Sequence, residues 1–439
     1  MAESARTGVT RRAFLGGVGA AGVAGLAVGG VGGYLGGKAS AGRGSTGLSG
    51  QGKTLVVGSG SPVTGGYAGD GQEMVRGQTI AIEEINARGG LLGQKIELSV
   101  LDTKDQSADV MKNVFRRFVS QGVGAVFAGY TTYDSVEYPI VGDAGIPTYH
   151  VNTWHGNLDF VKEKNYSNIF QGCPSEQWYG PGFVFVVDKL INSGAWKPTS
   201  KTVAIVTSND PYSLAIAQAV RTGLEGKGWT TSMFQEFTVP QADWNAVLLK
   251  IRKNPPGIIF FSDYDPGDEA SFIKQFRQSP TRSLVYQQYA PSVPQYLQLA
   301  GSAADGVIWS TMIGTITADR FGQAFISKYS GRYNEQPGLA LAGGYYDIVR
   351  LWARAVEESG DPYNFKAVSA ATANSIFRGV SGAFSFVPGF LNTPPYPDQV
   401  SDPSIGMPHL TFQIQGGKQA LISPDPYATG QFQLPSWLK

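Results

Sequence analysis

Short apolar runs alternate with amphipathic stretches along most of the chain. The apolar runs are rich in Val, Ile and Phe and bounded by turn residues, and they predict strands at residues 54–59, 96–101, 125–128, 147–151, 202–207, 231–237, 257–262, 284–288 and 307–310. Apolar positions at helical spacing predict helices at residues 70–88, 108–120, 135–143, 176–192, 212–226, 242–254, 269–278, 319–329 and 339–359. Strands that alternate with helices form parallel sheets covered by helices, so the pattern predicts an α/β fold.

Two stretches of the pattern bear on later points. The predicted helix at 70–88 places Met74, Gly77, Ala81 and Ile85 on one stripe, and the pair at 89–90 ends it. Residues 384–408 are rich in Pro, Ser and Asp, which predicts a long irregular excursion before a late strand at 410–414.

Length and composition narrow the class of protein. The 439 residues exceed what one ordinary core holds, so two domains are expected. Hydrophobic residues at 42% provide enough material for packed interiors, which excludes intrinsic disorder for the bulk of the chain. With 35 Lys+Arg against 34 Asp+Glu there is no net basic charge for nucleic acid to bind, and no nucleic-acid partner is expected.

Cysteine and histidine are too scarce for most metal and nucleophile chemistry. One Cys excludes an internal disulfide, and with three His it excludes a multi-Cys zinc site, so no metal and no cofactor are expected. Cys173 with His150 or His155 is the only combination that imitates a thiol nucleophile, and a lone Cys is more often a buried small residue. The sequence has no GxSxG elbow and no HExxH motif. An exported hydrolase is therefore the weaker alternative, and the chain is expected not to be an enzyme.

The first forty residues have the pattern of an export signal. Arg11 and Arg12 precede a weakly apolar, Gly-rich stretch at 13–37, which resembles a twin-arginine signal read by the twin-arginine export machinery. Ala39-Ser40-Ala41 provides a small-x-small cleavage site, so residues 1–41 are predicted to be the signal peptide and 42–52 a flexible linker. The expected location is the periplasm or the extracellular cell envelope. The alternative is an uncleaved signal that tethers the chain to the membrane, because the uncharged stretch is long enough to cross it.

Two phosphate-binding patterns are misleading matches. Residues 47–54 fit GxxxxGK[ST], but that loop works between a strand and a helix, and here a linker precedes it and a strand follows. Residues 58–63 imitate a dinucleotide fingerprint and lack its third glycine. No nucleotide site is predicted.

Several motifs carry a family resemblance over residues 53–420. They are Pro62-Val63-Thr64-Gly65 after the first strand, the run AIEEINARGGLLGQKIEL at 81–98, Asp102, the loop 128–132 (AGYTT) after the third strand, and Gly343-Gly344-Tyr345-Tyr346-Asp347. Together they resemble type I periplasmic solute-binding proteins of ABC importers, in the leucine-binding-protein-like branch that takes branched-chain amino acids, amides or urea.

The resemblance implies an α/β fold of two doubly wound lobes joined by three hinge crossings, near residues 169–174, 309–314 and 381–388. Lobe I would comprise residues 53–170 plus 312–385, and lobe II residues 171–311 plus 386–439. The ligand would lie in the cleft where strand carboxyl ends face each other, as in open α/β sheets generally.

The resemblance also implies which residues bind the ligand. Thr131, Thr132 and Tyr133 are expected at the N-terminus of a helix that begins near Asp134, where hydroxyls and free amides hold a carboxylate or amide oxygen. The remaining predicted contacts follow other strands of the two sheets, and they are Tyr67, Asn152, Thr153, Trp154, Tyr212, Asp263, Tyr264 and Tyr289. The alternatives are a plain capping role for the two threonines, a solvated loop acid at Asp263, and ordinary packing for any single Tyr.

One departure from the family pattern affects the ligand. Where amino acid binders carry an acid for the ligand's ammonium group, this chain has Tyr289, unless Asp263 substitutes from the neighbouring strand. Asp134 and Glu137 add negative charge close to the expected carboxylate site. The expected ligand is a small neutral or zwitterionic nitrogenous solute, an amino acid, amide or urea.

The implied mechanism is capture of this solute without chemistry and delivery to an ABC permease and its ATPase. A sensor subunit of the same fold that reports to a regulator is the alternative within the family.

Overall fold

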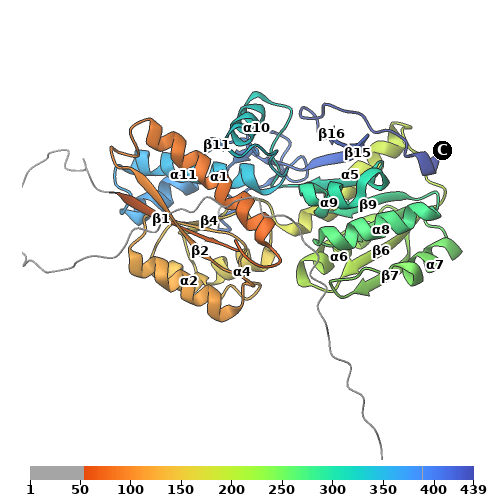
Figure 1. Cartoon of the computed structure of the whole chain (residues 1–439), viewed down its shortest axis with the longest axis horizontal. Helices are drawn as coiled ribbons and strands as arrows, with labels where there is room; N and C mark the ends of the chain where they lie inside the picture. The colour runs from red at the N-terminus through yellow and green to blue at the C-terminus, as the bar shows by residue number, and fades with distance from the viewer. Residues whose placement is uncertain (1–53, 388) are drawn as a thin grey trace, which may run out of the picture. The chain divides into compact units, whose positions relative to one another are not determined.

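The computed structural model describes residues 54–387 and 389–439, and its first sheet is parallel throughout (Figure 1). The five strands run in the order β2-β1-β3-β4-β5. Their bounds are β1 Leu55–Ser61, β2 Ile96–Asp102, β3 Val126–Ala128, β4 Thr148–His150 and β5 Ile169–Gln171. The predicted export signal at 1–41 and the linker at 42–52 lie outside the described residues.

A second sheet has seven strands in the order β16-β15-β10-β9-β8-β6-β7, in which β15 is antiparallel to both of its neighbours, β10 and β16. Its strands are β6 Thr202–Ser208, β7 Thr230–Phe237, β8 Ile258–Ser262, β9 Leu284–Gln288, β10 Ile308–Thr311, β15 Leu410–Gln415 and β16 Lys418–Ser423. Two small sheets pair β11 Phe377–Arg378 with β12 Ala383–Phe384, and β13 Pro395–Tyr396 with β14 Met407–Pro408. In both large sheets the first strand lies between the second and the third, which is the doubly wound order.

The helices connect these strands as the α/β prediction requires. They are α1 Ala68–Ala87, α2 Ala108–Gln121, α3 Tyr138–Asp143, α4 His155–Glu163, α5 Tyr179–Asn192, α6 Pro211–Glu225, α7 Asn245–Lys253, α8 Pro266–Gln278, α9 Pro294–Ala300, α10 Arg320–Tyr333, α11 Leu341–Ser359 and α12 Phe365–Asn374. The predicted strands are confirmed within two residues at their ends. Helices α4, α9 and α12, strands β5 and β16 and the short strands β11–β14 were not predicted. Of the described residues, no helix is both long and apolar enough to span a membrane.

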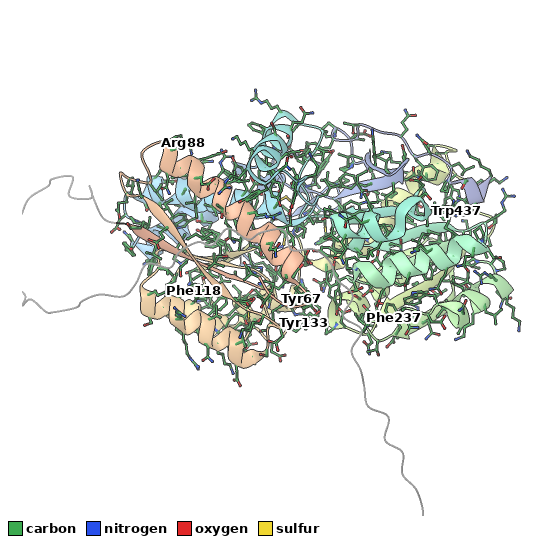
Figure 2. All side chains as sticks on the ribbon, in the orientation of Figure 1. Tyr67, Arg88, Phe118, Tyr133, Phe237 and Trp437 are labelled. Carbon is green, nitrogen blue, oxygen red and sulfur yellow. The ribbon has the colours of Figure 1, made fainter. Side chains whose placement is uncertain are left out.

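The first lobe is built on β1–β5, and two helices distant in sequence cover one face of its sheet. Helices α1 and α11 pack side by side there, and α2 lies on the opposite face (Figure 1). The approach is so close that a Cβ added at Gly77 would lie 2.1 Å from the carbonyl oxygen of Ala342. The predicted stripe of Met74, Gly77, Ala81 and Ile85 is buried, which confirms it as the core face of α1. Phe118, labelled in Figure 2, packs against β1 from the other side, 2.6 Å from where a Gly58 side chain would begin.

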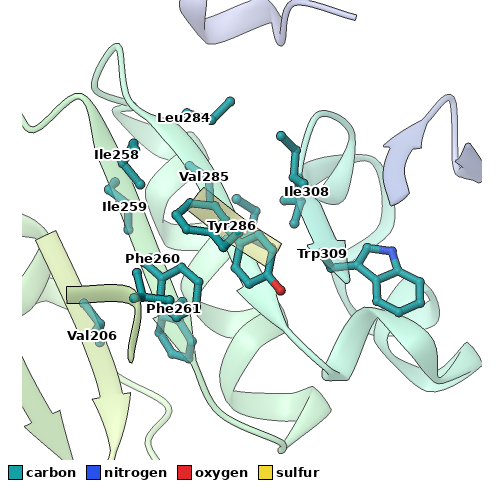
Figure 3. Packing of buried hydrophobic residues seen from close by; sticks show 14 of the residues in the cluster. Val206, Ile258, Ile259, Phe260, Phe261, Leu284, Val285, Tyr286, Ile308 and Trp309 are labelled. Carbon is teal, nitrogen blue, oxygen red and sulfur yellow. The ribbon is translucent and has the colours of Figure 1, made fainter. Parts of the chain in front are cut away.

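The second lobe is built on β6–β10 and has an aromatic core. Successive side chains on a strand point to opposite faces of the sheet. On β8, Phe260 contacts Phe183 of α5, with ring centroids 4.9 Å apart, while Phe261 contacts Phe272 of α8 at 4.6 Å. Tyr286 of β9 stacks on Phe260 (Figure 3). The alternation shows that helices cover both faces of this sheet.

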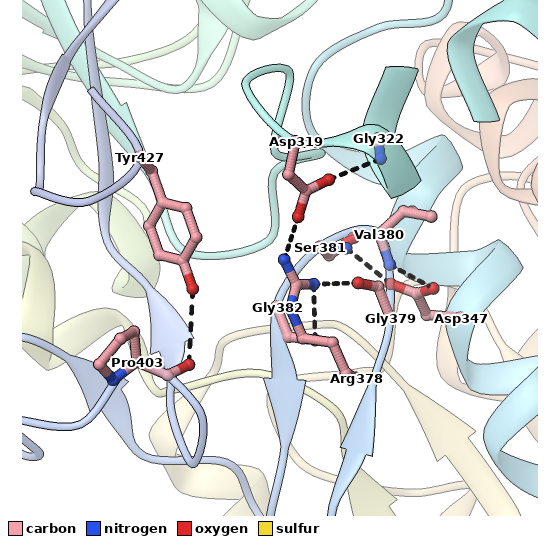
Figure 4. Close-up of polar contacts among 10 residues, drawn as sticks. All are labelled: Asp319, Gly322, Asp347, Arg378, Gly379, Val380, Ser381, Gly382, Pro403 and Tyr427. Atoms are coloured by element: carbon pink, nitrogen blue, oxygen red, sulfur yellow. Dashed lines mark hydrogen bonds and ion pairs between the residues drawn. The ribbon is translucent and has the colours of Figure 1, made fainter. Parts of the chain in front are cut away.

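Three crossings join the two lobes, after β5, after β10 and after β12. At the third crossing, the buried Asp347 of α11 accepts the backbone N–H groups of Val380 and Ser381, both at 2.8 Å, and burial raises its pKa to about 6 (Figure 4). Asp319 caps α10 by accepting the Gly322 N–H at 2.8 Å and pairs with Arg378 of β11. These contacts attach the crossing segment to two helices of lobe I.

Candidate ligand-binding site

A cavity of about 620 Å³ lies between the carboxyl-end loops of the two sheets. In the doubly wound order, the loops that follow the first and third strands border the crevice of each sheet. The lining residues follow this rule, since Tyr67 comes after β1, Tyr130 after β3, Asp210 after β6 and Tyr264 after β8. The site therefore arises from strand order in both lobes.

Most residues predicted as ligand contacts line this cavity. They are Tyr67, Thr131, Tyr133, Asn152, Thr153, Trp154, Tyr212, Tyr264 and Tyr289. Figure 2 labels two of them, Tyr67 and Tyr133. Their role in binding a ligand stays a prediction.

Thr132 and Asp263 are not brought to the cavity wall. The Thr132 N–H and hydroxyl both donate to the carboxylate of Glu137, at 2.9 and 2.7 Å. Asp263 is fully buried behind the loop after β8, and neither of its carboxylate oxygens has a hydrogen-bond partner among the described residues. Burial raises the pKa of Asp263 to about 8. Thr132 does not cap α3, which has no side-chain cap, but bonds within the turns that precede that helix. Asp263 is not a solvated loop acid.

The expected helix start near Asp134 was wrong, because α3 begins at Tyr138. The intervening residues form turns tied together by side chains: Val136 N–H donates to the Thr132 hydroxyl at 3.0 Å, and Ser135 N–H to the Thr132 carbonyl at 3.2 Å. Glu137, buried next to these turns, takes the place that a ligand carboxylate was expected to occupy.

The hydroxyl of Thr131 is also used inside the protein. It donates to Asn157 Oδ1 at 2.6 Å and accepts from Asn152 Nδ2 at 2.5 Å. The Asn157 amide group in turn donates to Ser135 Oγ at 2.7 Å and to the Thr132 carbonyl at 3.1 Å. Asn157 is fully buried on α4, so it fixes the whole loop after β3. Asn157 was not among the predicted site residues because α4 was not predicted.

A carboxylate and two tyrosines meet across the cavity. Tyr130 of lobe I and Tyr289 of lobe II both donate to Asp70 Oδ2, at 2.6 and 3.0 Å, and their hydroxyls lie 3.0 Å apart. Burial raises the pKa of Asp70, although the two hydrogen bonds oppose this. Tyr289 has φ 70° and ψ −58°, a strained conformation that costs about 1–3 kcal/mol and is typical of ligand clamps.

Two more charged residues of α1, which the sequence analysis did not single out, face the cavity. Glu73 accepts from Tyr329 OH and from the Gly338 N–H, and Arg76 donates to Glu335 at 2.7 Å. Positions 70, 73 and 76 lie three apart and share one side of the helix next to the buried stripe. This three-residue spacing was the sequence feature that could have identified Glu73 and Arg76.

Another hydrogen bond connects the lobes at the cavity mouth. Tyr133, which is exposed, donates from its hydroxyl to Asp210 Oδ1 at 3.2 Å, and its ring meets the ring of Trp154 edge-on, with centroids 5.0 Å apart. Asp210 is also the N-cap of α6 and accepts the Ser213 N–H at 3.0 Å.

Two arrangements that imitate enzyme nucleophiles lie elsewhere in the fold. Ser310 Oγ is 3.0 Å from His409 Nε2, and His409 Nδ1 is 2.6 Å from Asp398 Oδ2, which is the hydrogen-bond order of a serine hydrolase. Ser310 is only 2% exposed, is also bonded to Tyr286 OH at 2.6 Å, and does not line the cavity. A substrate has no access to it.

Cys173, the candidate thiol nucleophile, is inaccessible as well. It is buried, and burial raises the pKa of its thiol, while burial lowers the pKa of His150 to about 3 and Tyr138 OH occupies His150 Nε2 at 2.8 Å. Within the described residues, no group of three or more His, Cys, Asp or Glu side chains is arranged to hold a metal ion.

Two doubly wound lobes, three crossings and an interlobe cavity are the architecture of a type I solute-binding protein. The chain belongs to the periplasmic binding protein family, whose model matches residues 54–390, and it is a leucine-binding-protein-like type I member rather than an enzyme. Membership in a periplasmic family supports an exported location.

Relatives agree with this assignment. The chain is 24% identical to the leucine-, isoleucine-, valine-, threonine- and alanine-binding protein of Pseudomonas aeruginosa, over 74% of this chain and 83% of the relative. It is 34% identical to the crystal structure of a putative branched-chain amino acid ABC transporter from Silicibacter pomeroyi, with a TM-score of 0.83 over 88% of this chain and all of that one. At 22% identity and a TM-score of 0.69, over 85% of this chain and all of that one, the fold is also that of the branched-chain amino acid transporter substrate-binding protein of Streptococcus pneumoniae, solved with isoleucine.

Proposed function

We infer that the chain is the exported substrate-binding subunit of an ABC importer, which captures a small nitrogenous solute between its lobes and delivers it to a membrane permease. The observation that carries this inference is the cavity of about 620 Å³, lined by carboxyl-end loops of both sheets. Its volume falls within the range of about 300–1,000 Å³ that is usual for small-molecule sites.

Capture follows from the three crossings. A ligand that contacts both walls stabilises only the closed arrangement, so binding shifts the lobes toward closure without any covalent step. We assign residues 53–170 plus 312–385 to lobe I and residues 171–311 plus 386–439 to lobe II. The two sheets support this division, and the closed form would be the one that docks on the permease and its ATPase.

The solute class is proposed from the relatives and from this cavity together. Their names make branched-chain and other amino acids the first class to test, with amides and urea next. The residue after β9 is Tyr289, so an acid for the ligand's ammonium has to come from elsewhere, and Asp70 is the acid that Tyr289 contacts.

Thermal unfolding of the full chain against a panel of solutes tests this function. A ligand at a hundredfold excess over its dissociation constant stabilises the folded state by about 2.7 kcal/mol. Amino acids, aliphatic amines, short amides and urea are compared with isovalerate, a nitrogen-free control. Stabilisation by at least one nitrogenous solute and none by isovalerate is expected, and no stabilisation by any of them would reject the function.

Export and delivery need separate tests. We propose that the twin-arginine machinery exports the chain, so replacing Arg11 and Arg12 together with Lys should keep it inside the cell. Permease and ATPase genes beside this one would support import, whereas a lone regulator gene would support the sensor role.

A further inference from the structure

The charged side chains that line the cavity are mostly acidic. Five carboxyl groups face it, from Asp70, Glu73, Asp210, Asp265 and Glu335, against the single guanidinium of Arg76. That guanidinium is already used, since it donates to Glu335 at 2.7 Å and to Tyr329 OH at 3.0 Å. A negatively charged ligand group would therefore meet a surplus of negative charge and no uncommitted base.

The protein's own carboxylates also occupy the backbone positions that usually receive an anion. Helix N-termini bind anions through unpaired N–H groups and the helix dipole. At the start of α6 the Ser213 N–H is taken by Asp210, and at the start of α8 the Gly267 and Asp268 N–H groups are taken by Asp265, at 2.7 and 3.0 Å. In lobe I the Thr132 N–H is taken by Glu137. These N–H groups are thus closed to a ligand carboxylate. The N-terminus of α1, which also lines the cavity, has no side-chain cap, but Asp70 places an acid in its first turn.

Asp70 differs from these carboxylates, because one of its two oxygens remains available to a ligand. Tyr130 and Tyr289 both donate to Oδ2, and no described residue donates to Oδ1. The side chain is half-buried and lines the cavity. The strained backbone of Tyr289 holds that hydroxyl on Asp70 from the other lobe. The carboxylate is therefore oriented with one oxygen left for a positively charged partner.

Aromatic rings surround this carboxylate. The lining includes seven tyrosines and Trp154, and Tyr67 lies beside Tyr130 and Tyr264 with ring centroids 5.8 and 6.1 Å away. Burial holds the pKa of Tyr130 and Tyr289 well above the usual tyrosine value, so the hydroxyls stay neutral donors. Aromatic faces attract cations, and cages of such rings bind organic ammonium groups.

We propose that the solute is an organic ammonium ion without a carboxylate, whose charge contacts Asp70 and whose body packs against the tyrosines. The proposal rests on the inferred capture function and selects one chemical class within it. An amine meets the free oxygen of Asp70 and the aromatic faces. The carboxylate of the corresponding amino acid meets the occupied N–H groups of α6, α8 and Thr132 and a surplus of acidic side chains.

The test is calorimetric titration of the full chain with matched pairs that differ only in the carboxylate. Isoamylamine is compared with leucine, and phenethylamine with phenylalanine; choline tests a quaternary ammonium. At least one amine or choline should bind, and each amine should bind at least tenfold more tightly than its amino acid. Tighter binding of the amino acids, or binding of amides or urea alone, overturns this proposal and leaves the capture function intact. Binding by none of the solutes overturns both.

One variant tests whether the carboxylate of Asp70 is the group that contacts the ammonium ion. Asp70→Asn keeps the shape of the side chain and removes the negative charge, and it should weaken binding of the preferred ammonium compound at least tenfold. Asp109→Asn, an exposed acid in the first turn of α2, is the matched control and should change nothing. Unchanged affinity in Asp70→Asn overturns the assignment, and the wild-type ranking of amine over amino acid remains decisive if that variant does not fold.

Discussion

The two lobes share a strand order and differ in how they satisfy the loops at the cavity. In lobe I the loop after β3 is bonded internally, through Thr131, Asn157 and the carboxylate of Glu137. In lobe II the loops after β6 and β8 end in aspartates that cap helices, and Asp263 lies beneath them with no hydrogen bond to its carboxylate among the described residues. The difference indicates that hydrogen bonds hold the lobe I loop after β3 in place, whereas the lobe II edge lies over a buried acid whose carboxylate has none among the described residues.

The largest expected effect comes from breaking the lobe I network. Asn157→Ala leaves the hydroxyls of Thr131 and Ser135 without that partner in a buried site, and unsatisfied buried polar groups cost about 1–3 kcal/mol each. We expect a loss of about 3 kcal/mol in the free energy of unfolding, measured by chemical denaturation. Asn113→Ala, at an exposed position of α2, is the control. A loss no larger than the control's would show that the lobe I loop does not depend on this network.

The second effect concerns the buried acid of lobe II. Because the folded pKa of Asp263 is raised to about 8, its stabilising contribution is present below the unfolded pKa of about 4 and is lost as pH rises through 8. The wild-type protein should lose about 2 kcal/mol of stability between pH 6 and pH 8 through this residue. Asp263→Asn should lose much less over the same range, as followed by denaturation at both values. Equal pH dependence in the two proteins would remove the contrast between the lobes.

A smaller effect is expected where the lobes meet at Asp70. Tyr289→Phe removes one of the two hydrogen bonds to Asp70 Oδ2 and should weaken the best-binding solute about fivefold, or about 1 kcal/mol, in calorimetry. Tyr396→Phe, which removes a hydroxyl bonded to the Asp425 carbonyl away from the cavity, is the comparison. If both variants bind as the wild type does, the interlobe hydrogen bond contributes nothing to capture.

The smallest effect belongs to the exposed contact at the cavity mouth. Tyr133→Phe removes the bond to Asp210, and an exposed bond of this kind is worth about 0.5 kcal/mol. The closed fraction of the ligand-free protein should fall about twofold, as read from small-angle scattering. Tyr363→Phe, also exposed, should leave the scattering unchanged. A change of several-fold would mean that this contact, rather than Asp70, holds the lobes together.

Much of the fold could be predicted from the sequence because buried parallel strands are continuous apolar runs. The predicted strands at 202–207 and 257–262 each contain four consecutive apolar residues, and the stripe on α1 follows from helical spacing. Helix α4 was not predicted because one of its three buried positions is Asn157. Only two buried apolar residues remain, too few to show helical spacing. Strand β5 is only three residues long.

The cavity was predicted in part for a related reason. Loops at the cavity follow the carboxyl ends of strands, so Tyr67, Asn152 and Tyr264 could be assigned to the cavity from their positions after predicted strands. Whether a hydroxyl such as that of Thr131 is free depends on a partner in another element, and Asp70 acquires its role only when Tyr289 reaches it from the other lobe. Sequence spacing carries no information on either contact.

The packing of α1 against α11 through Gly77 bears on how the chain is made. Helix α11 helps to cover one face of the lobe I sheet, and it ends at Ser359. That face therefore stays incompletely covered until the parallel strands of lobe II have been synthesised. The strands β15 and β16, which complete the other half, come later still. Neither lobe is encoded as one uninterrupted stretch of sequence. A chain that is truncated early therefore has two incomplete cores, and neither lobe can be exchanged between relatives as a single continuous segment.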